Sequence, residues 1–179
     1  MVIDKRLIGE KIILRQIELT DCTLDYVRWL NDEKVNQYLE TRWSEQNLET
    51  IKEFVDMQRS NSYSILLAIV ARDTNQHIGN IKIGPISRYH HADISYFIGE
   101  KSYWGKGIIT EAISLICRFG FEELGLHRIE ARAYEAAVGS WKSLEKNGFK
   151  REGILRDAVM WKDQYMNIFK YGLLETEWK

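Results

Sequence analysis

The sequence predicts an α+β fold in which helices flank one mixed β-sheet, and two patterns indicate it. Three apolar, strand-like runs, residues 63–71, 77–86 and 92–98, are separated by short polar turns, which is typical of an antiparallel meander. A long amphipathic segment, 106–123, follows the meander and leads into another strand-like run, 127–134. A strand, a helix and a strand in this order predict a crossover between parallel strands. The complete predicted order is β-α-α-β-β-β-α-β-α-β-β.

The first third of the chain is predicted to contribute one strand and two helices. Residues 11–15 are the strand, and a short helix starts at Thr20 and Asp21. Ser44 is a good N-cap and predicts the start of the second helix. The apolar residues at helical spacing are Leu24, Val27 and Leu30 in the first helix and Leu48, Ile51 and Val55 in the second.

The last third is predicted to form a short helix and a closing hairpin. Gly125 fits the stop of the long helix, whose apolar stripe holds Ala112, Leu115, Ile116 and Phe119. The short helix spans Ser140–Asn147 and ends at Gly148. Two strands, 154–161 and 165–174, follow and pair around the turn Lys162-Asp163-Gln164.

Composition predicts one soluble globular domain, for which we expect the bounds 8–178. Hydrophobic residues make up 45% and charged residues 28% of 179 positions, which is ordinary for such a protein. The net charge of −1 argues against general nucleic-acid binding. Cys22 and Cys117 have no metal-binding spacing, so we expect free thiols and no metal. Without a recognisable signal peptide or an apolar run long enough to span a membrane, we expect a cytoplasmic protein and no membrane partner.

The stretch Tyr103-Trp104-Gly105-Lys106-Gly107 opens the long helix and is the strongest candidate for a binding site. Two glycines at a helix start let main-chain N–H groups approach a ligand, and the helix N-terminus carries partial positive charge. Together these features favour an anion, most often a phosphate. A plain tight turn before a helix is the alternative for the glycines, and Lys106 would contact a phosphate or be solvated.

Three motifs in order resemble the GCN5-related N-acetyltransferase (GNAT) superfamily. They are the strand Ile94–Ile98, the loop Gly105-Lys106-Gly107 and the segment Leu144-Glu145-Lys146-Asn147-Gly148-Phe149. Within it, the chain resembles the branch of ribosomal-protein N-terminal acetyltransferases. This likeness includes Arg28-Trp29-Leu30-Asn31-Asp32, Leu126-His127-Arg128-Ile129-Glu130-Ala131 and the tail Leu173–Trp178. The resemblance covers residues 8–178.

The resemblance implies acetyl-coenzyme A (acetyl-CoA) as cofactor and direct acetyl transfer to an amine in a ternary complex. The pantetheine arm would enter a gap between the strands 94–98 and 127–134, where a main-chain N–H near Phe97 or Ile98 would polarise the thioester carbonyl. The residues that the resemblance places on the cofactor are Tyr96, Phe97, Ile98, Tyr103, Trp104, Gly105, Lys106, Gly107, Ile108, Ile109, Thr110, Ser140 and Lys146.

Three positions depart from the superfamily pattern. Ser102 stands where Arg or Gln usually starts the pyrophosphate loop, and Ala137 stands where an Asn usually contacts the cofactor. Leu144 occupies the place of the Tyr that protonates the leaving thiolate in many members. Ser140 matches a serine of the ribosomal-protein branch, which implies a hydrogen bond to the coenzyme A sulfur. The alternative is that Ser140 only caps its helix.

Asp93 is the first candidate for the base that takes the proton of the attacking amine. It matches an acidic position of the same branch, and alternation places it on one strand face with Ser95 and Phe97. The alternative is a solvated carboxylate. The rival bases are His90, His91 and Glu135, while Glu100 is expected to cap a loop.

The resemblance places the acceptor amine against the two N-terminal helices and the last hairpin. The candidate contacts there are Arg28, Trp29, Asn31, Glu40 and Trp161. Aromatic residues at these places would stack on a sugar or base, or fill the core. Arg28 would hold a phosphate or carboxylate, or form an ion pair with Asp25 or Asp32.

Three functions remain open at the level of sequence. The first is acetylation of a protein N-terminus, which an open groove would favour. The second is acetylation of a small amine: a closed pocket with Arg28 facing a diphosphate would favour a nucleotide-linked amino sugar, and an acidic pocket a polyamine. The third is a catalytically silent acyl-CoA-binding module, because Ala137 and Leu144 lack the usual side chains. The sequence does not fix the oligomeric state and leaves a homodimer open.

Overall fold

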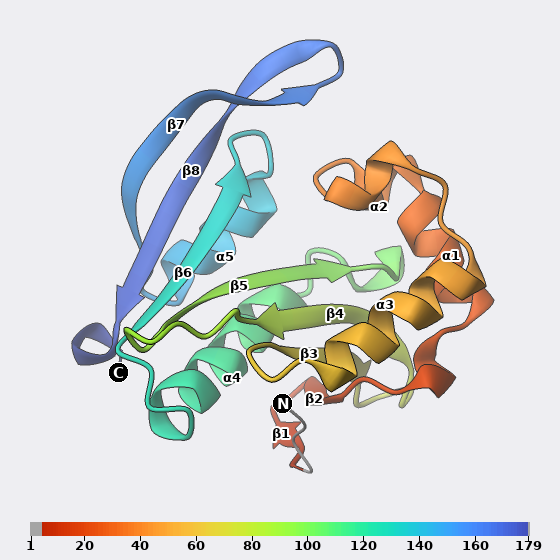
Figure 1. The fold of residues 1–179 in the computed structure, drawn as a ribbon, viewed down its shortest axis with the longest axis horizontal. Helices are drawn as coiled ribbons and strands as arrows, with labels where there is room; N and C mark the ends of the chain where they lie inside the picture. Colours follow the sequence, from red (N-terminus) through yellow and green to blue (C-terminus); the bar gives the residue numbers. More distant parts are fainter. Residues whose placement is uncertain (1–4, 179) are drawn as a thin grey trace.

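The computed structural model describes residues 5–178, whose strands form one mixed sheet in the order β1-β2-β3-β4-β5-β6-β8-β7 (Figure 1). The strands are β1 Leu7–Ile8, β2 Ile12–Gln16, β3 Ile65–Ala71, β4 His77–Ile83, β5 His91–Ile98, β6 Arg128–Tyr134, β7 Lys150–Trp161 and β8 Gln164–Leu174. The α-helices are α1 Leu24–Asn31, α2 Glu33–Asn36, α3 Leu48–Ser60, α4 Ile108–Glu122 and α5 Val138–Lys146. Only β5 and β6 pair in parallel among the described strands, and α4 connects them, which confirms the predicted α+β fold and its crossover.

Both N-terminal helices start later than predicted. Thr23, not Thr20, caps α1, and its hydroxyl accepts the N–H of Tyr26 at 3.4 Å. Asn47, not Ser44, caps α3 and accepts the N–H groups of the first helical turn. Ser44 instead ends a short 3₁₀ turn, η2 (Glu40–Trp43). The strand β1 and the single-turn helix α2 were not predicted, because elements of two and four residues show no periodicity.

The helix α5 starts earlier than predicted, and this changes the place of Ser140. Its N-cap is Ala137, which makes no side-chain capping bond, and Val138 is the first helical residue. Ser140 is therefore the third residue of α5, so the prediction that it starts the helix, and the alternative that it serves as the N-cap, are wrong.

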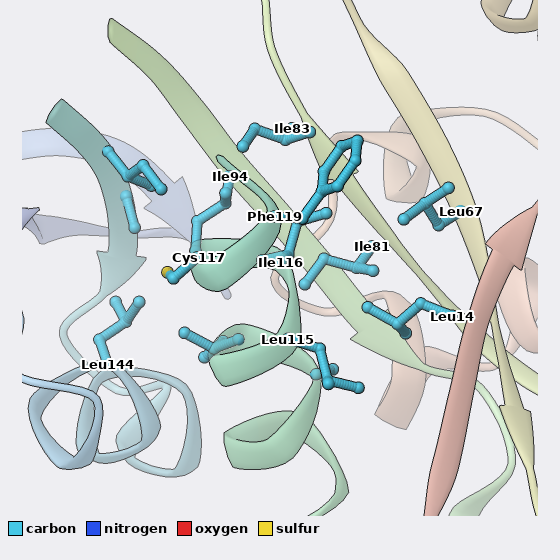
Figure 2. Packing of buried hydrophobic residues seen from close by; sticks show 14 of the residues in the cluster. Leu14, Leu67, Ile81, Ile83, Ile94, Leu115, Ile116, Cys117, Phe119 and Leu144 are labelled. Atoms are coloured by element: carbon cyan, nitrogen blue, oxygen red, sulfur yellow. The ribbon is translucent and has the colours of Figure 1, made fainter. Parts of the chain in front are cut away.

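Two apolar cores lie on opposite faces of the sheet. Leu115, Ile116 and Phe119 of α4 pack against the sheet on one face, and Leu144 of α5 joins this core (Figure 2). On the other face α1 and α3 contribute Trp29 and Val55. All seven residues of β3 are buried, which explains its unbroken apolar run. Each fully buried aliphatic side chain stabilises the fold by about 1.5–3 kcal/mol.

The β7–β8 hairpin extends away from both cores (Figure 1). β7 lies at one edge of the sheet, with most of its residues exposed, and its pairing with β8 shifts register between Leu155 and Val159. The tip of the hairpin therefore forms an arm whose side chains face solvent or the segment around η2. Within residues 5–178, no helix combines the length and the apolar composition needed to cross a membrane.

Candidate active site

The parallel strands β5 and β6 pair over only half of their length. Their ladder runs from His91–Arg128 to Ile94–Ala131, yet β5 continues to Ile98 and β6 to Tyr134. Beyond the last pair each strand remains bonded to its outer neighbour, β4 or β8. The two strands diverge in Figure 1, so the inner edges of residues 95–98 and 132–134 have no β5–β6 pairs, and we refer to this unpaired region between the strands as the gap.

The bonds between β4 and β5 determine which main-chain groups face that gap. Gly84 donates to the carbonyl of Asp93 at 2.8 Å, and Gly99 donates to the carbonyl of Ile78 at 2.9 Å. Residues of an antiparallel strand turn their N–H and C=O groups alternately to one side and the other. The odd-numbered residues of β5 therefore face β4, and the even-numbered residues face β6.

Tyr96 and Ile98 are thus the residues whose N–H groups point into the open part of the gap. Phe97 turns its N–H toward Asn80 of β4, with which it is paired in the ladder. The prediction of a carbonyl-polarising N–H at Phe97 is therefore wrong, whereas Ile98 remains a candidate and Tyr96 joins it. The Ile98 carbonyl accepts the indole N–H of Trp104 at 2.9 Å, so the loop is fastened to the strand here.

The side chains of β5 also alternate, with even-numbered residues on one face of the sheet and odd-numbered residues on the other. Ile94, Tyr96 and Ile98 lie on the face covered by α4 and α5. Asp93 and Phe97 lie on the opposite face, where Phe97 packs with the residues of α1. The alternation that the sequence predicted for Asp93 and Phe97 is confirmed.

The glycine loop leaves the start of α4 open. Gly105 and Gly107 have φ of 73° and 79°, the left-handed region that glycine adopts without strain. Gly107 is the N-cap of α4 and supplies no capping side chain. A Cβ added at Gly105 would meet nothing within 4 Å, so no other part of the protein covers the main chain at that point. A pyrophosphate fits this cradle, because the first N–H groups of a 15-residue helix need an acceptor.

The larger side chains of the loop are used to hold it in place. The hydroxyl of Tyr103 donates to Asp73 at 2.9 Å and lies 3.0 Å from Thr74. Ile108 is 4% exposed and lies in the core, so only its main chain can face a ligand. Lys106 is exposed, with its ammonium 5.2 Å from the ring of Tyr103.

The side chain of Lys11, directly before β2, reaches the same loop and was not predicted from the sequence. Lys11 donates from Nζ to the carbonyl of Lys106 at 3.0 Å, and its main-chain N–H donates to Glu111 of α4 at 3.0 Å. Lys11 and Lys106 thus bring positive charge to a loop in which Ser102 provides none. No local signal could have identified this contact, because the two lysines are 95 positions apart.

The helix α5 is fastened to α4 beside the gap. The hydroxyl of Thr110 donates to Ser143 at 3.2 Å, and Asn147 donates to the carbonyl of Thr110 at 3.0 Å. Thr110 therefore joins the two helices, while Lys146 is exposed near the end of α5. Leu144 has no exposed surface and packs in the core, so no side chain reaches the gap from that position.

Ser140 lies beside Tyr96 at the gap. The phenol oxygen of Tyr96 is 3.1 Å from Ser140 Oγ and 3.4 Å from the Ser140 carbonyl. Burial raises the pKa of the Tyr96 phenol, so this group stays protonated. The structure thus joins two of the predicted site residues directly.

The candidate bases are spread along both strands. Asp93 lies within the paired part of the ladder, opposite Glu130, one residue before the last pair. His91 stacks on Tyr89 with ring centroids 6.3 Å apart. Glu135, directly after β6, accepts from Asn167 at 3.1 Å.

Glu100 caps the turn before the glycine loop, as predicted. Its carboxylate accepts the N–H of Ser102 at 3.3 Å. The Glu100 side chain therefore belongs to the architecture of the loop.

A cavity of about 690 Å³ opens between α2, η2 and the tip of the β7–β8 hairpin. Asn31 and Trp161, both predicted acceptor contacts, are among its lining residues. Its charged lining is mixed, with three basic and two acidic side chains: Lys34, Arg42, Lys162, Glu33 and Glu45. The cavity is thus open and nearly balanced in charge.

Glu40 lies next to this cavity and is joined to the end of β6. Its carboxylate accepts the hydroxyl of Tyr134 at 2.8 Å and the indole N–H of Trp43 at 3.2 Å. The hydrogen bond from the Tyr134 hydroxyl is the largest cause that lowers the pKa of Glu40. The bond from Trp43 and the charge of Arg42 lower it further, so the pKa lies below its usual range although partial burial raises it. Glu40 is therefore an anion that still exposes most of its side chain.

Aromatic residues connect the η2 segment to the hairpin arm. Tyr38 stacks on Trp161 with ring centroids 5.9 Å apart and an angle of 21°. Arg42 lies 5.4 Å above the ring of Tyr134 and donates to the carbonyl of Met160 at 3.3 Å. Arg42 and Tyr134 were not predicted from the sequence as neighbours of Glu40. The only local signal was the density of aromatic and charged residues at 38–43.

Two predicted acceptor contacts lie away from the cavity. Arg28 is exposed on α1 and pairs with Asp25 at 3.0 Å, which was the alternative left open for it. Trp29 is 5% exposed and packs in the core, and a Cβ on Gly99 would come within 2.1 Å of its ring. Trp29 therefore supports the loop after β5 and is not a wall of this cavity.

Known proteins resemble the chain over nearly its whole length. An acetyltransferase (GNAT) domain family matches residues 11–150. The uncharacterized N-acetyltransferase YoaA of Bacillus subtilis is 35% identical over 153 residues, covering 84% of this chain and 85% of YoaA. The putative ribosomal N-acetyltransferase YdaF of the same organism is 41% identical over 91 residues, about half of each chain (49% and 48%).

A solved structure shows the same fold. The spermidine N-acetyltransferase from Vibrio cholerae, in complex with CoA and spermine, superposes with a TM-score of 0.84 at 17% identity. The match covers 94% of this chain and 98% of that protein.

Proposed function

The chain belongs to the GNAT family of N-acetyltransferases, whose acetyl donor is acetyl-CoA, and on this premise we propose that its acceptor is the N-terminal amine of a peptide chain. The open cavity between η2 and the hairpin arm is the observation that carries the proposal. A groove of this kind accommodates the residues that follow a peptide N-terminus.

The charges around the cavity favour a peptide over the small amines. Arg28, the candidate clamp for a nucleotide diphosphate, is paired with Asp25 outside the cavity. An acidic pocket would favour a cationic polyamine, whereas the charged lining of this cavity has more basic than acidic residues. The similarity to the putative ribosomal N-acetyltransferase YdaF supports the same choice.

Glu40 is proposed to hold the amine before reaction. A protonated N-terminus is a cation, and a carboxylate that stays ionised attracts it and orders it beside Tyr134 at the open end of β6. Asn31 and Trp161 would contact the residues that follow. The acceptor would then approach the gap from the face of the sheet that bears Asp93 and Phe97.

The main chain of β5 is proposed to promote the attack. Bound acetyl-CoA supplies an activated acyl thioester. The N–H groups of Tyr96 and Ile98 point into the gap and would donate to the oxygen on which negative charge develops. Removal of one such donor typically costs a factor of about 10²–10³ in turnover.

Asp93 is proposed to take the amine proton through water. Asp93 and Tyr96 are three residues apart, which is about 10 Å along a strand. A carboxylate at that distance acts through an intervening water instead of by direct contact. Ser140 is proposed to donate a hydrogen bond to the departing sulfur from the opposite side of the gap.

A thiol-release assay against a panel of amines tests the acceptor. We expect peptides with a free N-terminus to give a higher kcat/KM than spermidine, a nucleotide-linked amino sugar or free amino acids. The same peptide with a blocked N-terminus is the control, and mass spectrometry locates the acetyl group. Preference for spermidine or the amino sugar would refute the peptide proposal.

Calorimetry and the thiol-release assay together distinguish an enzyme from a module that only binds acyl-CoA. We expect acetyl-CoA to bind in the micromolar range, which corresponds to about −8 kcal/mol. Binding without release of thiol for any acceptor would instead indicate a module that only binds acyl-CoA.

A further inference from the structure

We propose that Tyr96 is a positioning residue that directs the hydroxyl hydrogen of Ser140 into the gap, toward the sulfur of the leaving thiolate. The inference rests on the proposed role of Ser140 and adds to it a residue from the opposite side of the gap. Tyr96 would act only through Ser140 and would not contact the sulfur itself.

In the proposed arrangement, Tyr96 donates the hydrogen bond between the two residues and Ser140 Oγ accepts it. The phenol oxygen of Tyr96 has both acceptors of Ser140 in reach, Oγ at 3.1 Å and the carbonyl at 3.4 Å. A buried hydroxyl that keeps its proton needs an acceptor, because an unmet donor costs about 1–3 kcal/mol. Oγ is the closer of the two acceptors, and the proposed arrangement has Tyr96 donating to it.

If Tyr96 donates to Ser140 Oγ, the hydroxyl hydrogen of Ser140 is directed away from Tyr96. A serine hydroxyl has one hydrogen and two lone pairs. When a lone pair accepts from Tyr96, the serine hydrogen must point to another acceptor. Ser140 is the third residue of α5, beside the gap, and is only partly buried, so its hydroxyl hydrogen would be available to the sulfur of bound coenzyme A.

This arrangement replaces the phenol that the family often places on α5. The corresponding position is Leu144, which lies in the core without exposed surface. Here a phenol from β5, that of Tyr96, lies within hydrogen-bond distance of Ser140 on α5 instead. Two hydrogen bonds in series polarise each other, so the Ser140 hydroxyl becomes a stronger donor than it would be alone.

The proposed contact acts on one step, in which all atoms balance. The amine nitrogen forms a bond to the acetyl carbon, the carbon–sulfur bond breaks, and its electron pair stays on sulfur. Before this attack the bound ammonium loses one proton through water to Asp93, which leaves the neutral amine, and after it the nitrogen loses its second proton to solvent water. Ser140 donates a hydrogen bond to the thiolate and keeps its proton, and the thiolate is protonated later from solvent.

Ionisation of the CoA thiol in the binary complex tests the pair without an acceptor. The thiolate is followed by its ultraviolet absorbance as a function of pH, with the desulfo-CoA complex as the blank. We expect Ser140→Ala and Tyr96→Phe each to shift the ionisation equilibrium about tenfold toward the thiol, one unit in its pKa. Ser140→Thr, which keeps a hydroxyl, should restore the wild-type titration.

Two matched variants separate this effect from general loss of packing. Tyr171 is a second buried tyrosine that contacts α5, through a bond to Glu145 at 2.9 Å. Ser143 lies one turn beyond Ser140 and donates to Gly139 at 2.8 Å. Tyr171→Phe and Ser143→Ala should leave the thiol titration unchanged.

Kinetics with an active acceptor give a second readout. We expect Tyr96→Phe to lower kcat about three- to tenfold with an unchanged KM for acetyl-CoA, since one neutral hydrogen bond is lost. The double variant Tyr96→Phe/Ser140→Ala should be no slower than Ser140→Ala, because Tyr96 acts only through Ser140.

A wild-type thiol titration in Tyr96→Phe, with a shifted one in Ser140→Ala, would overturn the role of Tyr96. Wild-type titrations in both would remove Ser140 from the sulfur as well. Neither result depends on the acceptor, so failure of the peptide proposal is a separate outcome.

Discussion

In the proposed active site, the acetyl donor and the acceptor meet at a sheet whose two sides are built in different ways. The donor side, made of the β5 main chain, residues 103–110 and α5, offers mainly N–H groups that the backbone geometry has fixed. The acceptor side, made of residues 38–43, Tyr134 and Trp161, offers side chains gathered from distant segments. A site made of main chain tolerates changes of side chain, whereas a site made of side chains can change its ligand by substitution. We therefore expect mutations to separate the two sides cleanly.

Gly107→Glu should have the largest effect and should be confined to the donor side. The new carboxylate would face the phosphates at the start of α4, in a left-handed conformation that glycine alone adopts readily. We expect the affinity for CoA to fall at least about 100-fold, or 2.7 kcal/mol, in calorimetry.

Gly107→Ala is the matched control for backbone strain. Space is available for its Cβ, whose nearest neighbour would be Lys11 Nζ at 3.7 Å, so we expect a smaller loss of affinity. Unchanged affinity in a folded Gly107→Glu protein would show that the phosphates bind elsewhere.

Glu40→Gln should affect the acceptor side alone. The amide keeps an oxygen for the hydroxyl of Tyr134 but loses the charge that attracts the amine. We expect KM for the acceptor to rise about tenfold, with unchanged affinity for CoA, since a charged hydrogen bond is worth about 1.5–3 kcal/mol. An equal loss of CoA affinity would contradict the separation of the two sides.

Tyr134→Phe should change the acid response of the acceptor side. Donation from the Tyr134 hydroxyl is the first cause of the lowered pKa of Glu40, so its removal raises that pKa. The attractive charge is present above the pKa of Glu40 and is lost as pH falls through it. In the variant this loss, followed by carbon NMR of the Glu40 carboxyl, should therefore occur at higher pH than in the wild type. An identical titration would mean that the hydroxyl does not stabilise the carboxylate.

Arg28→Ala should have the smallest effect on either side. The side chain is 64% exposed and paired with Asp25, so its removal leaves the cavity intact. We expect less than about a twofold change in KM for both substrates, because exposed ion pairs are worth at most about 1 kcal/mol. A large rise in the acceptor KM would restore Arg28 as a substrate contact.

The sequence could predict most of the donor side because its signals are local. The glycine loop, the amphipathic α4 and the alternation of β5 each lie within a short stretch of chain. The direction of individual N–H groups could not be read in the same way. Whether Tyr96 or Phe97 faces the gap depends on the register with β4, which is set by contacts between strands.

The acceptor side could not be assembled from the sequence for the same physical reason. Glu40 and Tyr134 are 94 positions apart, and only the folded sheet brings them together. Trp29 looked equivalent to Trp161 as an aromatic residue near the acceptor, yet one is buried beneath Gly99 and the other lines the cavity. The helix α5 starts two residues before its predicted start, which excludes the alternative that Ser140 serves only as its N-cap.

The two-residue period of β5 also has an evolutionary consequence. In the proposed site, even-numbered residues of β5 would bind the donor with their N–H groups, and the odd-numbered residues Asp93 and Phe97 lie on the sheet face proposed for the acceptor. Substitution at an odd position can thus retune the range of accepted amines while the invariant acetyl donor keeps its contacts. Insertion or deletion of a single residue in β5 would turn the even-numbered residues to the orientation of the odd-numbered ones, and the reverse, all at once. Diversification along this strand should therefore proceed by point substitution, with its length held constant.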